Sequence, residues 1–129
     1  RKYSLSQIFI ISPLTTSQRL QNIAEHASGF LYAVSRLGIT GVEERYDDNL
    51  ATLLREAARL IGLPLAVGFG VSTPEQAMKM FEIGADAVIT GSRIIEFQSE
   101  QASQFDEKAF ADYLRSMVEI AARPPAFKA

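Results

Sequence analysis

Residues 65–76 read LAVGFGVSTPEQ and contain the passage from a strand to a helix. The apolar run at residues 65–69 is typical of a strand. Thr73 then offers an N-cap hydroxyl, Pro74 occupies the first helical position, and Gln76 stands where a capping box needs its second member. The stretch therefore predicts a buried strand, a turn containing glycine, and a helix that begins directly after Thr73.

The same succession of strand and helix runs along the whole chain. Its strands are predicted at residues 8–11, 30–34, 65–69 and 87–90. The run at residues 8–11 shows no polar alternation, which is typical of a strand that is covered on both faces. The helices are indicated by apolar residues spaced three and four apart, which places them on one face. These apolar stripes are Leu20, Ile23, Ala24 and Ala27; Leu50, Leu53, Leu54, Ala57 and Ile61; Ala77, Met80 and Phe81; and Phe110, Tyr113, Leu114, Met117, Val118 and Ala121.

Two stretches between these elements are expected to be less regular. Residues 38–48 contain two glycines and a run of acidic side chains, and they predict a polar, solvated loop. Residues 91–95 predict only a short helical turn. The acidic residues of the expected loop are Glu43, Glu44, Asp47 and Asp48.

Alternating strands and helices constrain the architecture, because such strands must run parallel and be joined by right-handed crossovers. A doubly wound sheet could hold four such units, but no G-x-G-x-x-G motif leaves the first strand, as a dinucleotide-binding sheet would usually show. A TIM (β/α)8 barrel has eight units in about 250 residues. The predicted fold class is therefore α/β, with residues 1–129 forming half of a TIM barrel domain. Residues 1–7 read as the tail of an earlier element, so we expect a piece of a longer chain.

The composition excludes several classes of protein. Thirteen Lys and Arg against fifteen Asp and Glu give a net charge of −2, without the basic excess of a nucleic-acid-binding protein. The absence of cysteine excludes a disulfide scaffold and a thiolate metal site, and it favours a reducing, cytoplasmic setting. Apolar runs are too short to cross a membrane, which takes about 20 residues. We expect no nucleic-acid partner, no membrane partner, no metal and no cofactor.

Glycines follow the third and fourth strands, at the places where a barrel binds its ligand. In a barrel the ligand lies at the carboxyl ends of the strands, and the last two loops commonly hold phosphate. Gly70 follows the third strand, and Gly91 and Ser92 lead from the fourth strand into a helix. Glycine lets the backbone approach a ligand, and a helix N-terminus attracts anions. The pattern predicts phosphate binding, with the alternative that Gly70 and Gly91 only satisfy the geometry of their turns.

Several stretches resemble a known enzyme family. They are residues 28–36, 38–41, 63–75 and 84–92, and the most specific is Tyr-x-x-Ser-Arg-x-Gly-x-Thr-Gly from Tyr32 to Gly41. These stretches are similar to the α subunit of tryptophan synthase almost without interruption, and residues 9–15 fit the fifth strand of its barrel. The Tyr32 to Gly41 stretch argues against another phosphate-binding barrel, such as one that acts on phosphoribosyl intermediates.

This resemblance implies strands five to eight of the barrel and an enzyme that reversibly cleaves indole-3-glycerol phosphate to indole and glyceraldehyde 3-phosphate. It also implies a β-subunit partner, in an α2β2 complex, that receives the indole. The resemblance also implies a role for each candidate site residue. Gly41, Gly70, Gly91 and Ser92 would bind the phosphate, Phe69 would flank it through its backbone, Tyr32 would line the substrate pocket, Thr40 would belong to the loop that closes over substrate, and Ile89 would form a wall of the indole pocket.

The family's catalytic carboxylates are expected to be missing from this sequence. Cleavage at the indole carbon needs a general acid and a group that accepts or stabilises the indole N–H. In the family these are a Glu and an Asp from the N-terminal half of the barrel, and neither position exists here. Asp86 opens a strand at the opposite end from the ligand. We therefore expect no catalytic residue in this piece, and no activity from it alone.

Two further expectations concern the remaining features. His26 is the only histidine and lies on the polar flank of the first helix, so a metal site or a catalytic triad lacks its partners. A rival interpretation from another functional class is a non-catalytic half-barrel that self-associates. Four unclosed parallel strands would leave two edges exposed, which favours pairing with another chain.

Overall fold

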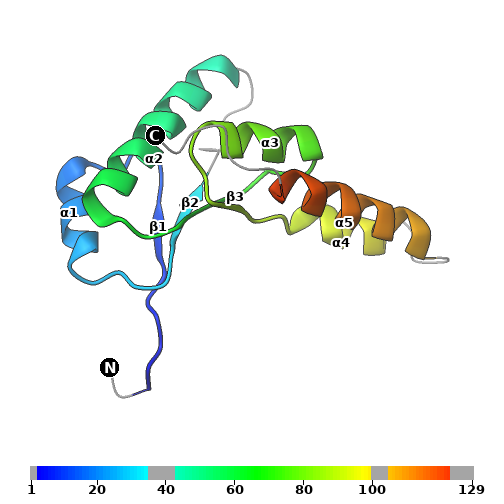
Figure 1. Ribbon diagram of the computed structural model, residues 1–129, viewed down its shortest axis with the longest axis horizontal. Helices are drawn as coiled ribbons and strands as arrows, with labels where there is room; N and C mark the ends of the chain where they lie inside the picture. Colours follow the sequence, from blue (N-terminus) through cyan, green and yellow to red (C-terminus); the bar gives the residue numbers. More distant parts are fainter. Residues whose placement is uncertain (1–2, 35–42, 100–104, 123–129) are drawn as a thin grey trace.

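The computed structural model describes residues 3–34, 43–99 and 105–122. Strands and helices alternate through most of these residues, as the sequence predicts. The elements are β1 (Phe9–Ile11), α1 (Ser17–Ala24), β2 (Leu31–Val34), α2 (Glu43–Ile61), β3 (Leu65–Gly68), α3 (Pro74–Glu82), β4 (Ala87–Val88), α4 (Ser92–Ser99) and α5 (Glu107–Ala121). The segment before β1 extends away from the sheet (Figure 1).

The strands form one parallel sheet in the order β1-β2-β3-β4. Leu31 of β2 stands beside Phe9 of β1 and Leu65 of β3, and Ala66 of β3 stands beside Ala87 of β4. A doubly wound sheet reverses its strand order at a switch point. Here each new strand is added beside the previous one, in the same direction, which is how the wall of a barrel is built.

One face of the sheet packs against the helices and forms the core. Side chains alternate between the two faces of a strand, so Ile11, Ala33 and Val67, which are in register, share a face. All three are buried, and they join the apolar stripes of α1, α2 and α3 in one cluster that contains Leu20, Leu54 and other residues. This packing explains why the predicted helical stripes are apolar.

The other face of the sheet is not covered in the same way. Ile10 is 68% exposed, and its register neighbours on this face are Tyr32 and then Ala66. The expectation that the first strand is covered on both faces is therefore wrong within the described residues. The helices pack on one face only, and Ile10 on the other face meets solvent (Figure 1).

The start of α2 corrects a second expectation. The predicted polar loop at residues 38–48 gives way to helix at Glu43, so that Glu44, Asp47 and Asp48 also lie in α2. The helical turn predicted at residues 91–95 is likewise longer, because α4 continues to Ser99.

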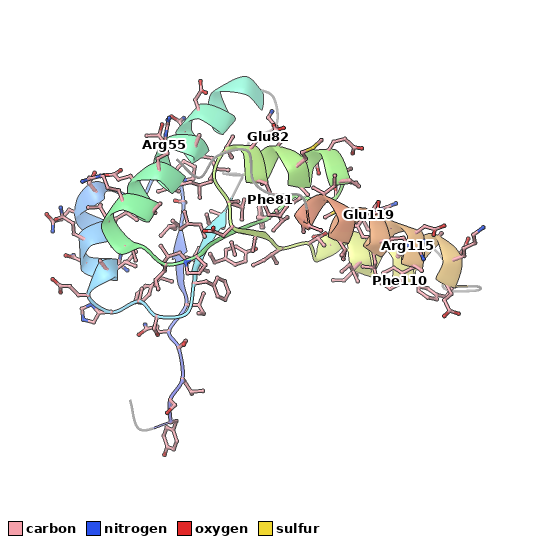
Figure 2. All side chains as sticks on the ribbon, viewed as in Figure 1. Arg55, Phe81, Glu82, Phe110, Arg115 and Glu119 are labelled. Carbon is pink, nitrogen blue, oxygen red and sulfur yellow. The ribbon has the colours of Figure 1, made fainter. Side chains whose placement is uncertain are left out.

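The helices gather into two groups along the sheet. α1 and α2 contact each other beside β1 and β2, whereas α3 contacts both β4 and α5 (Figure 1). Phe81 of α3 packs against the core together with Met117 and Ile120 of α5. Figure 2 shows Phe81 and Glu82 on opposite sides of α3, with Phe81 on the side of the sheet. The second group of helices therefore lies beside the strands whose carboxyl ends carry the candidate phosphate residues.

Candidate functional site

The loop after β3 has an unusual backbone. Phe69 and Gly70 have φ angles of 70° and 92°, so two consecutive residues adopt the left-handed conformation. Glycine accepts this conformation readily, but for another residue it costs about 1–3 kcal/mol. Phe69 is also 62% exposed. The backbone turn thus requires glycine at residue 70 and holds the exposed Phe69 in a strained conformation of the kind found at ligand-binding loops.

The start of α3 satisfies its own hydrogen-bond donors. The side-chain Oε1 of Gln76 accepts hydrogen bonds from the backbone N–H of Ser72 at 2.8 Å and of Thr73 at 3.2 Å. In return the backbone N–H of Gln76 donates to Thr73 Oγ1 at 3.3 Å. The predicted capping box is therefore confirmed. These donors are therefore engaged within the loop and in the first turn of α3.

The charge at the start of α3 is negative. The carboxylate of Glu75, in the first turn, accepts a hydrogen bond from its own backbone N–H and another from the Thr73 hydroxyl, which hold the pKa of Glu75 below its ordinary value of 4.5. A carboxylate that stays ionised here interacts favourably with the helix dipole. The same carboxylate repels a phosphate that approaches this end of α3.

The turn after β4 begins α4 in a different way. The carbonyl of Gly91 accepts hydrogen bonds from the backbone N–H groups of Ile94 at 3.0 Å and Ile95 at 3.2 Å. Gly91 therefore occupies the N-cap position, and Ser92, which is exposed, is the first residue of the helix. A helix N-terminus of this kind directs backbone N–H groups and a positive dipole toward an anion.

Gly91 differs from Gly70 in what its backbone requires. Its φ lies outside the left-handed range, and a Cβ built on it would meet no heavy atom of the described chain within 4 Å. Neither turn geometry nor packing within the described residues calls for glycine at this position. The interpretation that the glycine only satisfies a turn therefore suits Gly70 and does not suit Gly91.

Tyr32 and Ile89 both lie close to Gly68 on the face of the sheet opposite to the helices. A Cβ built on Gly68, which lies between them, would overlap with the hydroxyl oxygen of Tyr32 and would lie 3.2 Å from Cβ of Ile89. The Tyr32 ring thus extends across β3 toward the end of β4. The sequence did not single out Gly68, although a glycine inside a strand often marks the close approach of another group.

The candidate residues that follow β3 and β4 lie at the same end of the sheet, where the strands have their carboxyl ends. Val67 of β3 stands beside Val88 of β4, and both strands run in the same direction. Phe69 and Gly70 therefore follow β3 at the same end of the sheet at which Gly91 follows β4. Thr40 and Gly41, which the resemblance adds to the site, lie outside the described residues.

The other polar residues considered from the sequence have local structural roles. Asp86 lies at the opposite edge of the sheet, where its Oδ2 accepts a hydrogen bond from the backbone N–H of Leu65 at 3.0 Å. His26 is exposed just after α1, with its Nδ1 3.0 Å from the carbonyl oxygen of Asn22. In the described parts of the chain no three His, Asp or Glu side chains are grouped so as to hold a metal ion. No helix in those parts is long and apolar enough to cross a membrane.

Residues 1–122 match the sequence profile of a family described as tryptophan synthase alpha chain. The chain belongs to this family. The tryptophan synthase alpha chain of Methanosarcina barkeri is 50% identical over 99 residues, which cover 77% of this chain and 37% of the relative. That of Geobacillus kaustophilus is 40% identical over 124 residues, which cover 90% of this chain and 46% of the relative.

Solved structures of the tryptophan synthase alpha family have the same fold. The tryptophan synthase α2β2 complex of Pyrococcus furiosus contains a chain that superimposes with a TM-score of 0.74 at 30% identity, covering 92% of this chain and 47% of that one. The α subunit of the same organism gives a TM-score of 0.72 at 28% identity. These relatives are TIM barrels, and the four-stranded parallel sheet is consistent with part of such a barrel. The chain spans less than half the length of the relatives described here.

Proposed function

We propose that this chain is the C-terminal half of a tryptophan synthase alpha barrel, with residues 1–129 as strands five to eight, and that it supplies the phosphate-binding part of the site. In the complete protein the reaction would be the reversible cleavage of indole-3-glycerol phosphate to indole and glyceraldehyde 3-phosphate. The observation that carries the proposal is the pair of turns that follow β3 and β4 at one edge of the sheet, in a chain that belongs to this family.

Within this site the turn after β4 is the principal phosphate-binding element. Gly91 stands at the N-cap of α4 without a backbone or packing requirement for glycine, and Ser92 adds an exposed hydroxyl. Phe69 and Gly70 contribute their backbone from the neighbouring loop. The self-capped start of α3 and its ionised Glu75 favour this division, because that helix has little to offer an anion.

The indole end of the substrate would lie toward Tyr32 and Ile89. Both residues lie close to Gly68 on the face of the sheet that the helices leave uncovered. An aromatic ring and a branched aliphatic side chain suit a flat apolar group such as indole. Thr40 and Gly41 join the proposal on the family resemblance alone, as a residue of the closing loop and a phosphate ligand.

Catalysis would depend on groups from outside this chain. The cleavage needs a general acid and a partner for the indole N–H, and the family supplies both as carboxylates from the other half of its barrel. We place no catalytic residue in these 129 residues. The β subunit is the proposed protein partner of the complete enzyme, by analogy with the P. furiosus relative, which was solved as an α2β2 complex.

A second candidate, self-association of this half-barrel, is favoured by the uncovered sheet face. Ile10 is 68% exposed there, and β1 and β4 are edge strands of the described sheet. Exposed strand edges beside apolar side chains are typical sites of pairing between chains. This candidate concerns the assembly of these residues when they stand alone, and it does not compete with phosphate binding by the complete protein.

The proposal is tested by comparing ligand binding with turnover. A polypeptide of residues 1–129 should bind glycerol 3-phosphate weakly in a calorimetric titration and should not bind glycerol, because the phosphate provides the interaction. It should not convert indole-3-glycerol phosphate. Measurable turnover by the purified 129-residue chain would contradict the assignment of both catalytic groups to the other half.

A further inference from the structure

Helix α5 contacts both helices that follow the candidate phosphate turns. It contacts α3, and its Met117 and Ile120 pack against the same core as Phe81 of α3. It packs against α4 through Phe97, whose ring centroid lies 5.7 Å from that of Phe110. Figure 1 shows α5 running alongside α4, and Figure 2 shows Phe110 and Arg115 on α5. The last helix is thus placed to hold α3 and α4 relative to each other.

Tyr113 is the residue of α5 that reaches the turn itself. Its ring lies 5.2 Å from Phe97 between centroids, so the aromatic contact with α4 fixes its position. Its hydroxyl oxygen lies 3.2 Å from Oγ1 of Thr90, within hydrogen-bond distance. The guanidinium group of Arg93, in the first turn of α4, stacks 4.5 Å from the centroid of the same Phe97 ring. The aromatic contacts around Phe97 therefore hold the Tyr113 hydroxyl group within hydrogen-bond distance of Thr90.

Thr90 connects this contact to the candidate site. It directly precedes Gly91, whose carbonyl accepts the first hydrogen bonds of α4. A hydrogen bond at Thr90 limits how far the turn and the start of α4 can shift relative to α5. Binding sites need their donors held to within about 0.5 Å of the productive geometry.

We infer that Tyr113 is a positioning residue for phosphate binding, acting through its hydrogen bond with Thr90 on the Gly91–Ser92 turn. This inference rests on the proposed function of that turn. Tyr113 does not touch the ligand. It keeps the backbone donors of the turn in place, so that their geometry is set before the phosphate arrives.

The test uses Tyr113→Phe in the protein as the cell makes it, with glycerol 3-phosphate as the calorimetric probe. The variant keeps the ring and its contact with Phe97, and it removes only the hydroxyl. We expect the affinity to fall by about three- to tenfold, the range that corresponds to one neutral hydrogen bond. With indole-3-glycerol phosphate the same factor should appear as an increase in KM with little change in kcat, because the phosphate is remote from the bond that breaks.

Matched variants separate positioning from general stability. Ser116→Ala also removes one hydroxyl from α5, since Ser116 Oγ donates to the Tyr113 carbonyl at 2.7 Å, and it should bind the probe like wild type. Thr90→Val should reproduce the loss and Thr90→Ser should preserve the affinity. In the Thr90→Val background, Tyr113→Phe should cause no further loss, because the two substitutions remove one shared hydrogen bond.

The outcomes distinguish the inference from the function on which it rests. Equal affinities of wild type and Tyr113→Phe for glycerol 3-phosphate overturn the positioning role and leave the phosphate site intact. Additive losses from Tyr113→Phe and Thr90→Val overturn it too, because the residues would then act separately. A wild-type protein that does not bind the probe overturns both proposals. A loss confined to the Tyr113–Thr90 pair supports the inference.

Discussion

The hydroxyl of Tyr32 on β2 lies across the backbone of Gly68 on β3, in the space that a Cβ at residue 68 would occupy. Gly68 is buried and has an ordinary φ, so its importance comes from this neighbour and not from backbone conformation. The pair fixes where the Tyr32 ring lies on the uncovered face of the sheet. It therefore links the stability of the sheet to the proposed indole end of the site.

Gly68→Ala is the first prediction, and it should destabilise the protein. The added methyl group would overlap with the Tyr32 hydroxyl and lie 2.7 Å from Cζ of the ring, so the ring must move. Overpacking of this kind costs about 1–3 kcal/mol. Urea unfolding measures the change. The control is the same substitution in a Tyr32→Leu background, where the cost should largely disappear; an equal cost in both backgrounds would show that the tyrosine is not the obstacle.

The capping box of α3 gives the second prediction. Thr73→Ala removes the hydroxyl that accepts from the Gln76 N–H and donates to Glu75, and it should lower the free energy of unfolding by about 1 kcal/mol. Thr73→Ser keeps the hydroxyl and is the matched control. Chemical denaturation of the three proteins should place Thr73→Ser close to wild type. Equal losses in both variants would instead indicate a role for the threonine methyl group.

The third prediction concerns pH and Glu75. The folded state lowers the pKa of this carboxyl below 4.5, so it favours the ionised form. The resulting stability is present above the unfolded pKa and is lost as the pH falls through the folded pKa. The difference in urea midpoint between wild type and Glu75→Gln should therefore be larger at neutral pH than in acid. A titration of the Glu75 side chain by nuclear magnetic resonance should have its midpoint below 4.5; a midpoint above that value would exclude these hydrogen bonds.

The fourth prediction concerns assembly of residues 1–129 as an isolated polypeptide. Apolar side chains on the uncovered face of the sheet, such as Ile10, should drive self-association at micromolar concentration. Ile10→Lys should weaken this association in light scattering. Leu14→Lys is the control, because Leu14 is 74% exposed but lies in the loop after β1. A compact monomer for wild type under these conditions would contradict the prediction.

Local signals explain which parts of the fold could be predicted from the sequence. The start of α3 is predictable because Thr73, Pro74 and Gln76 interact within one turn of helix. The order of strands and helices follows from apolar periodicity in the same way. The start of α2 is not predictable in this way, because an acidic sequence such as residues 43–48 occurs both in solvated loops and at the start of helices.

The exposure of Ile10 illustrates a different limit. An apolar side chain in a strand indicates that its face is suited to burial, but it does not specify which segment covers that face. The sequence pattern therefore predicts two covered faces for β1, whereas the described helices cover one. Coverage depends on contacts between segments that are distant in sequence, which periodicity does not encode.

The candidate site shows the same division between local and distant information. Both Gly70 and Gly91 are visible in the sequence, but only their backbone geometry separates a glycine that a turn requires from one that it does not. Tyr113 belongs to the predicted apolar stripe of the last helix, and the stripe accounts for its ring. Its hydroxyl meets Thr90, which is 23 residues earlier, so no short motif could have indicated this contact.

The last prediction tests the turn after β4 directly, in the complete protein, by ranking three variants. Gly91→Asp adds a side chain and a negative charge where we propose the phosphate binds, and binding of glycerol 3-phosphate should be abolished. Ser92→Ala should be milder, since it removes one hydroxyl and leaves the N-terminal N–H groups of α4, with a loss of about 1.5–3 kcal/mol for a hydrogen bond to a charged group. Gly91→Asn adds nearly the same volume without the charge, and so it should fall between them.

The structure makes this ranking informative, because the fold should tolerate each change. A Cβ at Gly91 meets no heavy atom of the described chain within 4 Å, and its φ is ordinary, so Asp and Asn should fit without displacing the protein. Both residues are also good N-caps for a helix. Thermal unfolding should therefore find all three variants folded, and calorimetric titration should rank wild type above Ser92→Ala, then Gly91→Asn, then Gly91→Asp. Equal affinities across the series would mean that the turn only connects β4 to α4.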